Sequence, residues 1–204
     1  MSSFGGREGY TVPPLRRVAI RDFAAALRGR FGLADEARFP VIDFLERVLD
    51  QRLNMARTVI ADAHDMGGAE GLTCPSGDFV MLRTDVYDGA LAWGGRPRFT
   101  IAHEIGHLLL HANRPLARRA QSETVPAYKC SEWQADQFAA EVLMPFWQLC
   151  ASDTPAVVAK RHAVSYHAAE VRLAKLKSEG VLKGTPSSFP ERHRPKAQGA
   201  TPMK

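Results

Sequence analysis

Two histidines and a glutamate occur at a spacing that suits metal-dependent hydrolysis. His103, Glu104 and His107 form an HExxH motif. Because residues four positions apart share one face of an α-helix, about 6 Å apart along its axis, both imidazoles can reach one metal ion. Glu104 flanks that ion, where it can take a proton from water and deliver it to a leaving amine. The spacing predicts a hydrolytic zinc site, and the alternative is two ordinary histidines on an amphipathic helix.

A catalytic zinc site needs a third protein ligand, and the sequence offers two candidates. His111 follows four residues after His107, but the outer members of the row that starts at His103 lie about 12 Å apart along the axis. We therefore interpret His111 as a residue near the helix C-terminus that interacts favourably with the helix dipole. Glu132 begins a second predicted helix and is the better candidate, provided that this helix packs antiparallel to the first.

Three further residues are candidates for roles around the ion. Asp136 lies one helical turn beyond Glu132, so its carboxylate can accept the second ring N–H of a ligating histidine. Tyr128 precedes that helix and can donate to the oxyanion of the reaction. Cys74 lies in a predicted turn and could approach the metal as a thiolate. The alternative is an unreactive thiol, which is the commoner case for a lone cysteine in a turn. The alternative for Glu132 and Asp136 is a solvated helix N-terminus.

The elements that position these residues follow from hydrophobic periodicity. The HExxH helix is predicted over residues 98–112, after a loop at 94–97. The second ligand helix is predicted over 131–143, with Ser131 as its N-cap and a stop before Pro145. Other helices are predicted at 15–29, 40–53, 155–163 and 166–179, and strands at 57–63, 71–74 and 79–84. We expect an α+β fold in which a small twisted antiparallel sheet packs on the two ligand helices.

Length and composition favour one soluble domain. The 204 residues are 45% hydrophobic and 24% charged, which excludes collagen and wholly disordered chains. No apolar run is long enough for a membrane helix, and the polar N-terminus lacks the apolar region of a secretory signal. With three cysteines, this predicts a cytoplasmic protein with free thiols. We divide the chain into a flexible lead-in at 1–14, a folded domain at 15–183 and a disordered basic tail at 184–204.

The net charge of +5 permits contact with nucleic acid. Residues 156–182 resemble a helix-turn-helix, and a recognition helix there would expose Ser165, Tyr166, His167 and Arg172. The alternative, which we favour, is a helical pair that packs on the catalytic core or docks a substrate protein.

Two segments resemble the motifs of the ImmA/IrrE family of zinc metallopeptidases. RFTIAHEIGHLLLH at 98–111 resembles the first motif, and EWQADQFAAEVLMP at 132–145 resembles E-x-E-A-(N/D)-x-F-A-x-x-L-L-M-P. A weaker similarity at 159–173 extends the resemblance, which spans about residues 40–182. The departure is Gln134, where the family usually has glutamate.

The resemblance implies a minimal gluzincin-like fold and a cytoplasmic endopeptidase of bacteria or mobile elements. Such proteins cleave a transcriptional repressor, often under stress, so the expected partner is a helix-turn-helix repressor. The resemblance implies one Zn²⁺, with Mn²⁺ as an alternative. His103, His107 and Glu132 would be its ligands, and Glu104 the acid/base.

Two other functions remain open from the sequence. One is a DNA-binding transcriptional regulator with a structural zinc, which predicts salt-dependent duplex binding through residues 156–182. The other is an antagonist that binds a repressor without cleaving it.

Overall fold

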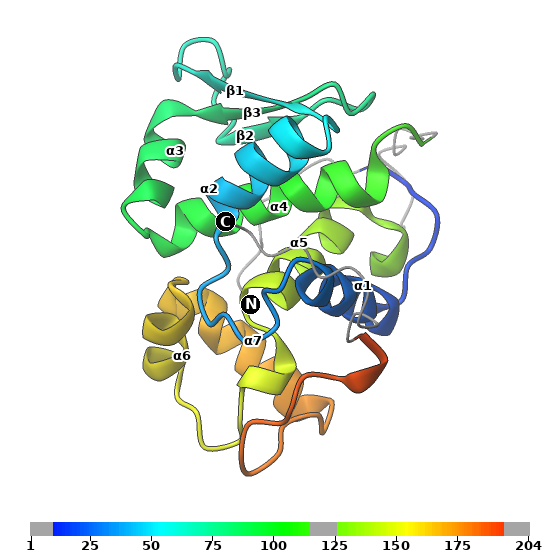
Figure 1. Ribbon diagram of the computed structural model, residues 1–204, viewed down its shortest axis with the longest axis vertical. Helices are drawn as coiled ribbons and strands as arrows, with labels where there is room; N and C mark the ends of the chain where they lie inside the picture. Colours follow the sequence, from blue (N-terminus) through cyan, green and yellow to red (C-terminus); the bar gives the residue numbers. More distant parts are fainter. Residues whose placement is uncertain (1–9, 115–125, 194–204) are drawn as a thin grey trace.

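The computed structural model describes residues 10–114 and 126–193. Over these ranges it has an α+β architecture in which a small sheet covers one side of a group of helices (Figure 1), and this confirms the predicted class. The helices are α1 (Arg17–Arg30), α2 (Val41–Asp43), α3 (Thr84–Leu91), α4 (Gly95–His111), α5 (Ser131–Leu143), α6 (Pro155–His162) and α7 (Tyr166–Ser178). The strands are β1 (Arg57–Ala61), β2 (Gly71–Thr73) and β3 (Phe79–Arg83). No helix among the described residues is long and apolar enough to cross a membrane.

The sheet has the order β1-β3-β2, and it is mixed, so the prediction of an antiparallel sheet is wrong for β1. β2 and β3 form the expected antiparallel hairpin, with Leu72 opposite Met81. β1 pairs with β3 in parallel, with Arg57 opposite Phe79, because residues 62–70 carry the chain to the far edge of the sheet. β2 is therefore an edge strand, and it packs against α4.

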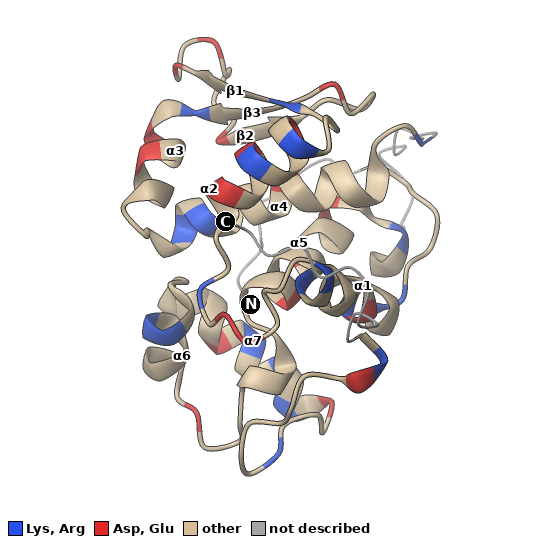
Figure 2. Ribbon diagram, viewed as in Figure 1, with Lys and Arg blue, Asp and Glu red and all other residues tan. Residues whose placement is uncertain are grey.

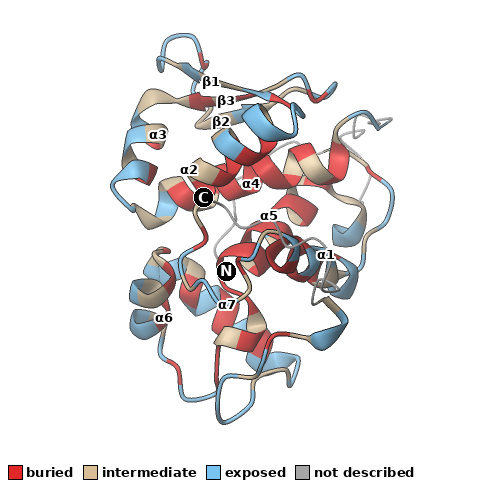
Figure 3. Cartoon of the chain, viewed as in Figure 1, coloured by how far each residue is buried: buried red, intermediate tan, exposed pale blue. Residues whose placement is uncertain are grey.

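Helix α4 occupies the centre of the described structure and packs against α5, α3 and the sheet. Figure 3 shows that α4 and α5 are mostly buried. The two helices approach closely at Gly106, within the HExxH motif. A Cβ there would lie 3.0 Å from a ring carbon of Phe138 and 3.2 Å from the Cα of Ala135. The small residue lets α5 approach the metal-ligand motif.

The start of α4 differs from the prediction. Residues 95–97, expected in a loop, form its first turn, where proline is well tolerated. A Cβ at Gly95 would lie 2.3 Å from the backbone of Val164 and Ser165, so glycine allows α4 to abut the α6–α7 turn.

Other elements also differ from the sequence predictions. The helix expected at 40–53 is a short α2 followed by a π-helical segment, Phe44–Arg52. Helix α3 was not predicted, because its short span offers only Val86 and Ala90 as buried residues. Ser131 does not cap α5: the cap is Cys130, and the Ser131 hydroxyl instead accepts a bond from the Tyr10 amide at 3.0 Å.

A buried group of charges connects α1, α5 and α7. Glu141, 1% exposed, accepts from Arg21 at 3.0 Å and from Arg172 at 2.9 Å. Glu141 therefore forms a buried ion pair with both arginines. Arg172 is 4% exposed, so its predicted place on a DNA-facing surface is wrong. Figure 2 shows lysines and arginines on several helices besides α6 and α7.

The described parts of both predicted flexible ends are packed against the domain. Thr11 forms an antiparallel bridge with Cys130, and Val12 is only 4% exposed. At the other end, Phe189 is 6% exposed and packs edge-on against Trp147. Residues 10–14 and 184–193 therefore do not fit the expectation of a loose lead-in and a disordered tail. The remainder of both segments lies outside the described residues.

Candidate metal centre

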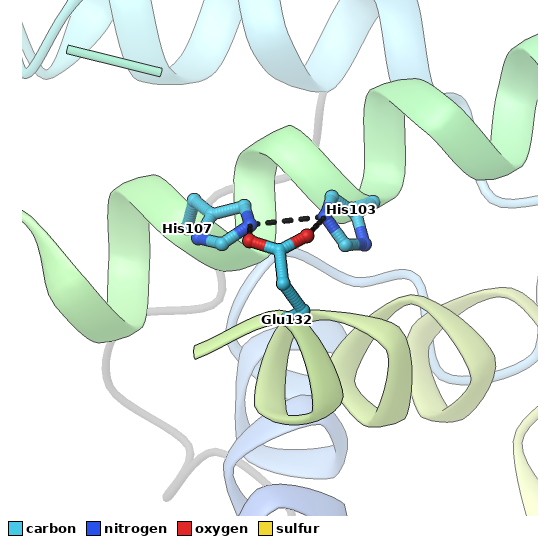
Figure 4. Close-up of side chains that lie close together, drawn as sticks. All are labelled: His103, His107 and Glu132. Atoms are coloured by element: carbon cyan, nitrogen blue, oxygen red, sulfur yellow. Dashed lines mark hydrogen bonds and ion pairs between the residues drawn. The ribbon is translucent and has the colours of Figure 1, made fainter. Parts of the chain in front are cut away.

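Helices α4 and α5 bring three candidate ligands to one point. His103 and His107 project from α4, and Glu132 reaches between their rings from the first turn of α5 (Figure 4). The two Nε2 atoms are 2.9 Å apart. Glu132 Oε2 lies 3.3 Å from His103 Nε2, and Oε1 lies 3.2 Å from His107 Nε2. The arrangement is the convergence that the sequence predicted for these residues.

The donor set fits a divalent cation. One ligand atom from each residue lies within 4.8 Å of the others. Bonds of about 2.0–2.2 Å in a tetrahedral site separate ligand atoms by about 3.3–3.5 Å, close to the observed spacing. Two imidazoles and one carboxylate suit Zn²⁺, and a fourth position would remain for a reactant.

The charge states of the candidate ligands are coupled. Burial raises the pKa of Glu132, but the contacts with the His103 and His107 rings outweigh this and hold that pKa well below its usual range. Burial lowers the pKa of His103, yet its bonds to Asp136 and Glu132 together raise it to about 9. Glu132 is consequently ionised at neutral pH, as a metal ligand must be.

Asp136 lies behind His103, where the sequence predicted it. Its Oδ1 is 2.8 Å from His103 Nδ1. The carboxylate accepts a hydrogen bond from Nδ1, and Nε2 of His103 is thereby directed at the candidate metal position.

His111 does not face the candidate metal position. Its Nδ1 lies 3.1 Å from Nδ1 of His107, on the side of that ring opposite the ligand nitrogen. Its Nε2 lies 2.9 Å from Oε1 of Gln134. Burial lowers the pKa of His111 to about 4, so it is neutral at pH 7. His111 is the last residue of α4, as predicted, but its ring is buried against Gln134 and does not supply a positive charge to the helix dipole.

Glu104 is held against the edge strand β2. It is 7% exposed, and its Oε2 accepts a hydrogen bond from the Thr73 hydroxyl at 2.8 Å. A Cβ at Gly71 would lie 2.7 Å from Cγ of Glu104, so only glycine fits at this position without a shift. Sequence reasoning missed both Thr73 and Gly71, because no local pattern reports a contact across 31 residues.

A cavity of about 550 Å³ opens over the three candidate ligands. Its walls include β2, Glu104 and the ion pair of Glu70 with Arg96, whose atoms are 2.5 Å apart. Cys74 also lines the cavity, and its Sγ lies 2.9 Å from the Ser76 hydroxyl. That contact with Ser76 lowers the pKa of the Cys74 thiol.

The Tyr128 side chain is 44% exposed and is not among the described residues that line this cavity. Its backbone carbonyl, rather than its hydroxyl, contacts the network behind the site, where it accepts from Gln134 Nε2 at 2.8 Å. Its role as an oxyanion donor stays a prediction.

Comparison with known proteins identifies one family. Residues 94–174 match the family model of the IrrE N-terminal-like domain, Peptidase_M78, over less than half of the chain. The matched range contains all three candidate ligands and confirms the resemblance to the ImmA/IrrE family. A search of curated proteins found no match.

Proposed function

Because residues 94–174 match the IrrE N-terminal-like domain, we propose that this chain is a zinc-dependent endopeptidase that cleaves a regulatory protein. The expected substrate is a helix-turn-helix repressor, whose cleavage would release gene expression in a stress or mobile-element switch in the cytoplasm. The observation that supports this proposal is the convergence of His103, His107 and Glu132 beside the buried carboxylate of Glu104. Zn²⁺ fits this donor set best, and Mn²⁺ is the alternative.

His103, His107 and Glu132 would hold the ion. When bound, it supplies a Lewis acid and makes water acidic enough to react near neutral pH. The chain supplies the proton transfers. Glu104 takes one proton from the attacking water as the water oxygen bonds to the peptide carbon, and delivers it to the nitrogen as the C–N bond breaks.

Thr73 fixes the orientation of the base. Since its hydroxyl donates to Oε2 of Glu104, Oε1 is left as the oxygen that accepts the proton. Glu104 lies along the cavity wall rather than in open solvent, which limits competing proton exchange.

The edge strand β2 suits an extended substrate. One edge of β2 pairs with β3, and the strand lines the cavity beside Glu104. A substrate segment can add to the sheet there through main-chain hydrogen bonds, which places a peptide bond near the candidate metal position.

Glu104→Gln tests the mechanism, because it keeps the shape of the side chain and removes the base. The zinc-loaded wild type and variant are incubated with a complex peptide library, and new N-termini are identified by mass spectrometry. We expect cleavage by wild type only, while both proteins bind one Zn²⁺. Equal cleavage by the variant, or no cleavage by zinc-loaded wild type, contradicts the proposal. Duplex DNA binding that is unaffected by Glu104→Gln, without cleavage, would instead favour the DNA-binding regulator.

A further inference from the structure

A row of side chains extends from the candidate metal position into the protein behind His107. The row passes from His107 Nδ1 to His111 Nδ1 at 3.1 Å, and from His111 Nε2 to Gln134 Oε1 at 2.9 Å. His111 and Gln134 are 4% and 1% exposed, so water does not compete for these bonds. The proton positions along the row follow from its far end.

Two backbone carbonyls fix the orientation of the Gln134 amide. Its Nε2 lies 2.9 Å from the carbonyl oxygen of Pro13 and 2.8 Å from that of Tyr128. A carbonyl oxygen can only accept, so the two N–H groups of the amide must face this pair. Oε1 of Gln134 therefore faces His111, and an amide oxygen can only accept a hydrogen bond from that ring.

The remaining proton positions follow in sequence. Because Gln134 Oε1 accepts, Nε2 of His111 carries a proton. His111 is buried, and its hydrogen-bond partners, His107 and Gln134, include no carboxylate that could compensate a charged ring. With its one proton on Nε2, His111 has a lone pair on Nδ1, which accepts a bond. The donor to this lone pair is Nδ1 of His107. In the neutral His107 ring Nε2 is then without a proton, and it accepts from Nε2 of His103, 2.9 Å away.

We infer that Gln134 and His111 are positioning residues that hold His107 in the tautomer whose Nε2 lone pair faces the metal position. The two candidate histidine ligands thus differ in their support. His103 is held by the carboxylate of Asp136, whereas His107 is held by a neutral relay that begins at two backbone carbonyls. The inference rests on the proposed function only in taking His107 as a ligand, since the tautomer is a property of the metal-free protein.

The tautomer can be observed directly. Long-range ¹H–¹⁵N correlation spectra of the metal-free protein at pH 7.5 report which nitrogen of each of the seven histidines carries a proton. The variant His111→Phe assigns the His111 signals by their loss. We expect the proton on Nδ1 of His107 and on Nε2 of His111. A proton on Nε2 of His107 in the wild type overturns the inference.

Metal affinity tests the consequence. Zn²⁺ binding is measured by competition with a chromophoric chelator for wild type, His111→Phe and His111→Asn. Phenylalanine keeps the ring but offers no acceptor, so we expect affinity to fall about 10–100-fold. The side-chain oxygen of asparagine can accept from His107 Nδ1, so His111→Asn is expected to retain affinity within about threefold of wild type.

Two controls separate the outcomes. His64→Asn changes an exposed histidine and should leave Zn²⁺ affinity unchanged, and denaturant unfolding of each metal-free variant verifies folding. Equal affinity of wild type and His111→Phe overturns the positioning role but leaves the metal site intact. If the wild type binds no Zn²⁺, the proposed function fails, and the tautomer spectra still decide the inference.

Discussion

The hydroxyl of Thr73 lies 2.8 Å from Oε2 of Glu104 and 3.0 Å from its backbone oxygen. A strand residue is thus bonded to the second residue of the HExxH motif from outside its helix. Thr73 is placed there by β2, the strand that also lines the cavity. Strand β2 therefore fixes the orientation of the proposed base, Glu104.

Replacement of Thr73 tests the hydrogen bond to Glu104. Thr73→Val keeps the branched shape and removes the donor, so Glu104 loses a bond worth about 1.5–3 kcal/mol because it is made to a charged group. We expect kcat to fall about tenfold or more, with Zn²⁺ affinity unchanged. Thr73→Ser keeps the donor and should stay within a few-fold of wild type. Equal kcat values for Thr73→Val and Thr73→Ser would exclude a role for the Thr73 hydroxyl in orienting Glu104.

Gly71→Ala tests the close approach of β2 to Glu104. The added Cβ would lie 2.7 Å from Cγ of Glu104, so this side chain must move. We expect cleavage to fall at least tenfold while the chain stays folded, since one flexible side chain can absorb the contact. Gly184→Ala is the matched control, because its Cβ would meet nothing within 4 Å. Activity that falls equally in both variants would contradict the prediction.

The candidate ligands were predictable because their geometry is local or depends on a single helix pair. His103 and His107 need only the period of a helix, and Glu132 and Asp136 share the first turns of another. Helix α5 was predicted with the bounds observed, since apolar periodicity and Pro145 define both ends. These features need no knowledge of the rest of the fold.

Features that depend on tertiary placement were not predictable. β1 shows no alternation of buried and exposed residues, and the alternation within β3 is the same for parallel and antiparallel pairing, so the sequence leaves the direction of β1 undetermined. Gln134 appeared only as a departure from the family motif. Its role depends on the carbonyl of Tyr128 and on that of Pro13, which lies in a segment expected to be flexible.

Metal removal tests the ligand set through stability. A ligand that binds only the folded state adds about 4 kcal/mol at a thousandfold excess over its Kd. We expect Zn²⁺ to raise the Tm of wild type and Glu104→Gln, and a chelator to reverse this. Glu132→Gln should lose most of the shift. Asp43→Asn, an exposed carboxylate outside the cavity, should keep it. A full Zn²⁺ shift in Glu132→Gln would remove that residue from the ligand set.

The buried charges between α1, α5 and α7 should dominate the stability of the helical region. Glu141→Gln leaves Arg21 and Arg172 buried without their shared carboxylate, and we expect a loss of about 3–5 kcal/mol in the free energy of unfolding. The comparison is Arg47→Ala, which breaks an exposed pair with Asp43 and should cost less than about 1 kcal/mol. Urea unfolding of the metal-free proteins measures both. Similar losses in the two variants would contradict the prediction.

From the burial of His162 we predict that the folded protein loses stability in acid. The side chain is fully buried, its Nδ1 donates to the Ala37 carbonyl at 2.7 Å, and its Nε2 has no hydrogen-bond partner among the described residues. Burial lowers its pKa to about 4, and the bond to Ala37 only partly opposes this. Since the unfolded chain titrates near 6.5, the unfolded state binds the proton first as pH falls. The contribution of His162 to the free energy of unfolding is fully present above about pH 6.5, and it is lost as the pH falls to about 4.

The variant His162→Asn isolates this effect, because asparagine can still donate to Ala37 but does not titrate. Urea unfolding at pH 7 and pH 4 should show that wild type loses about 3 kcal/mol more than the variant over this interval. His111 has a similarly lowered pKa, but it is present in both proteins, so its contribution cancels. Parallel stability curves for the two proteins would mean that His162 titrates as an ordinary histidine. Such a result would also contradict the buried neutral ring that connects α6 to the segment before α2.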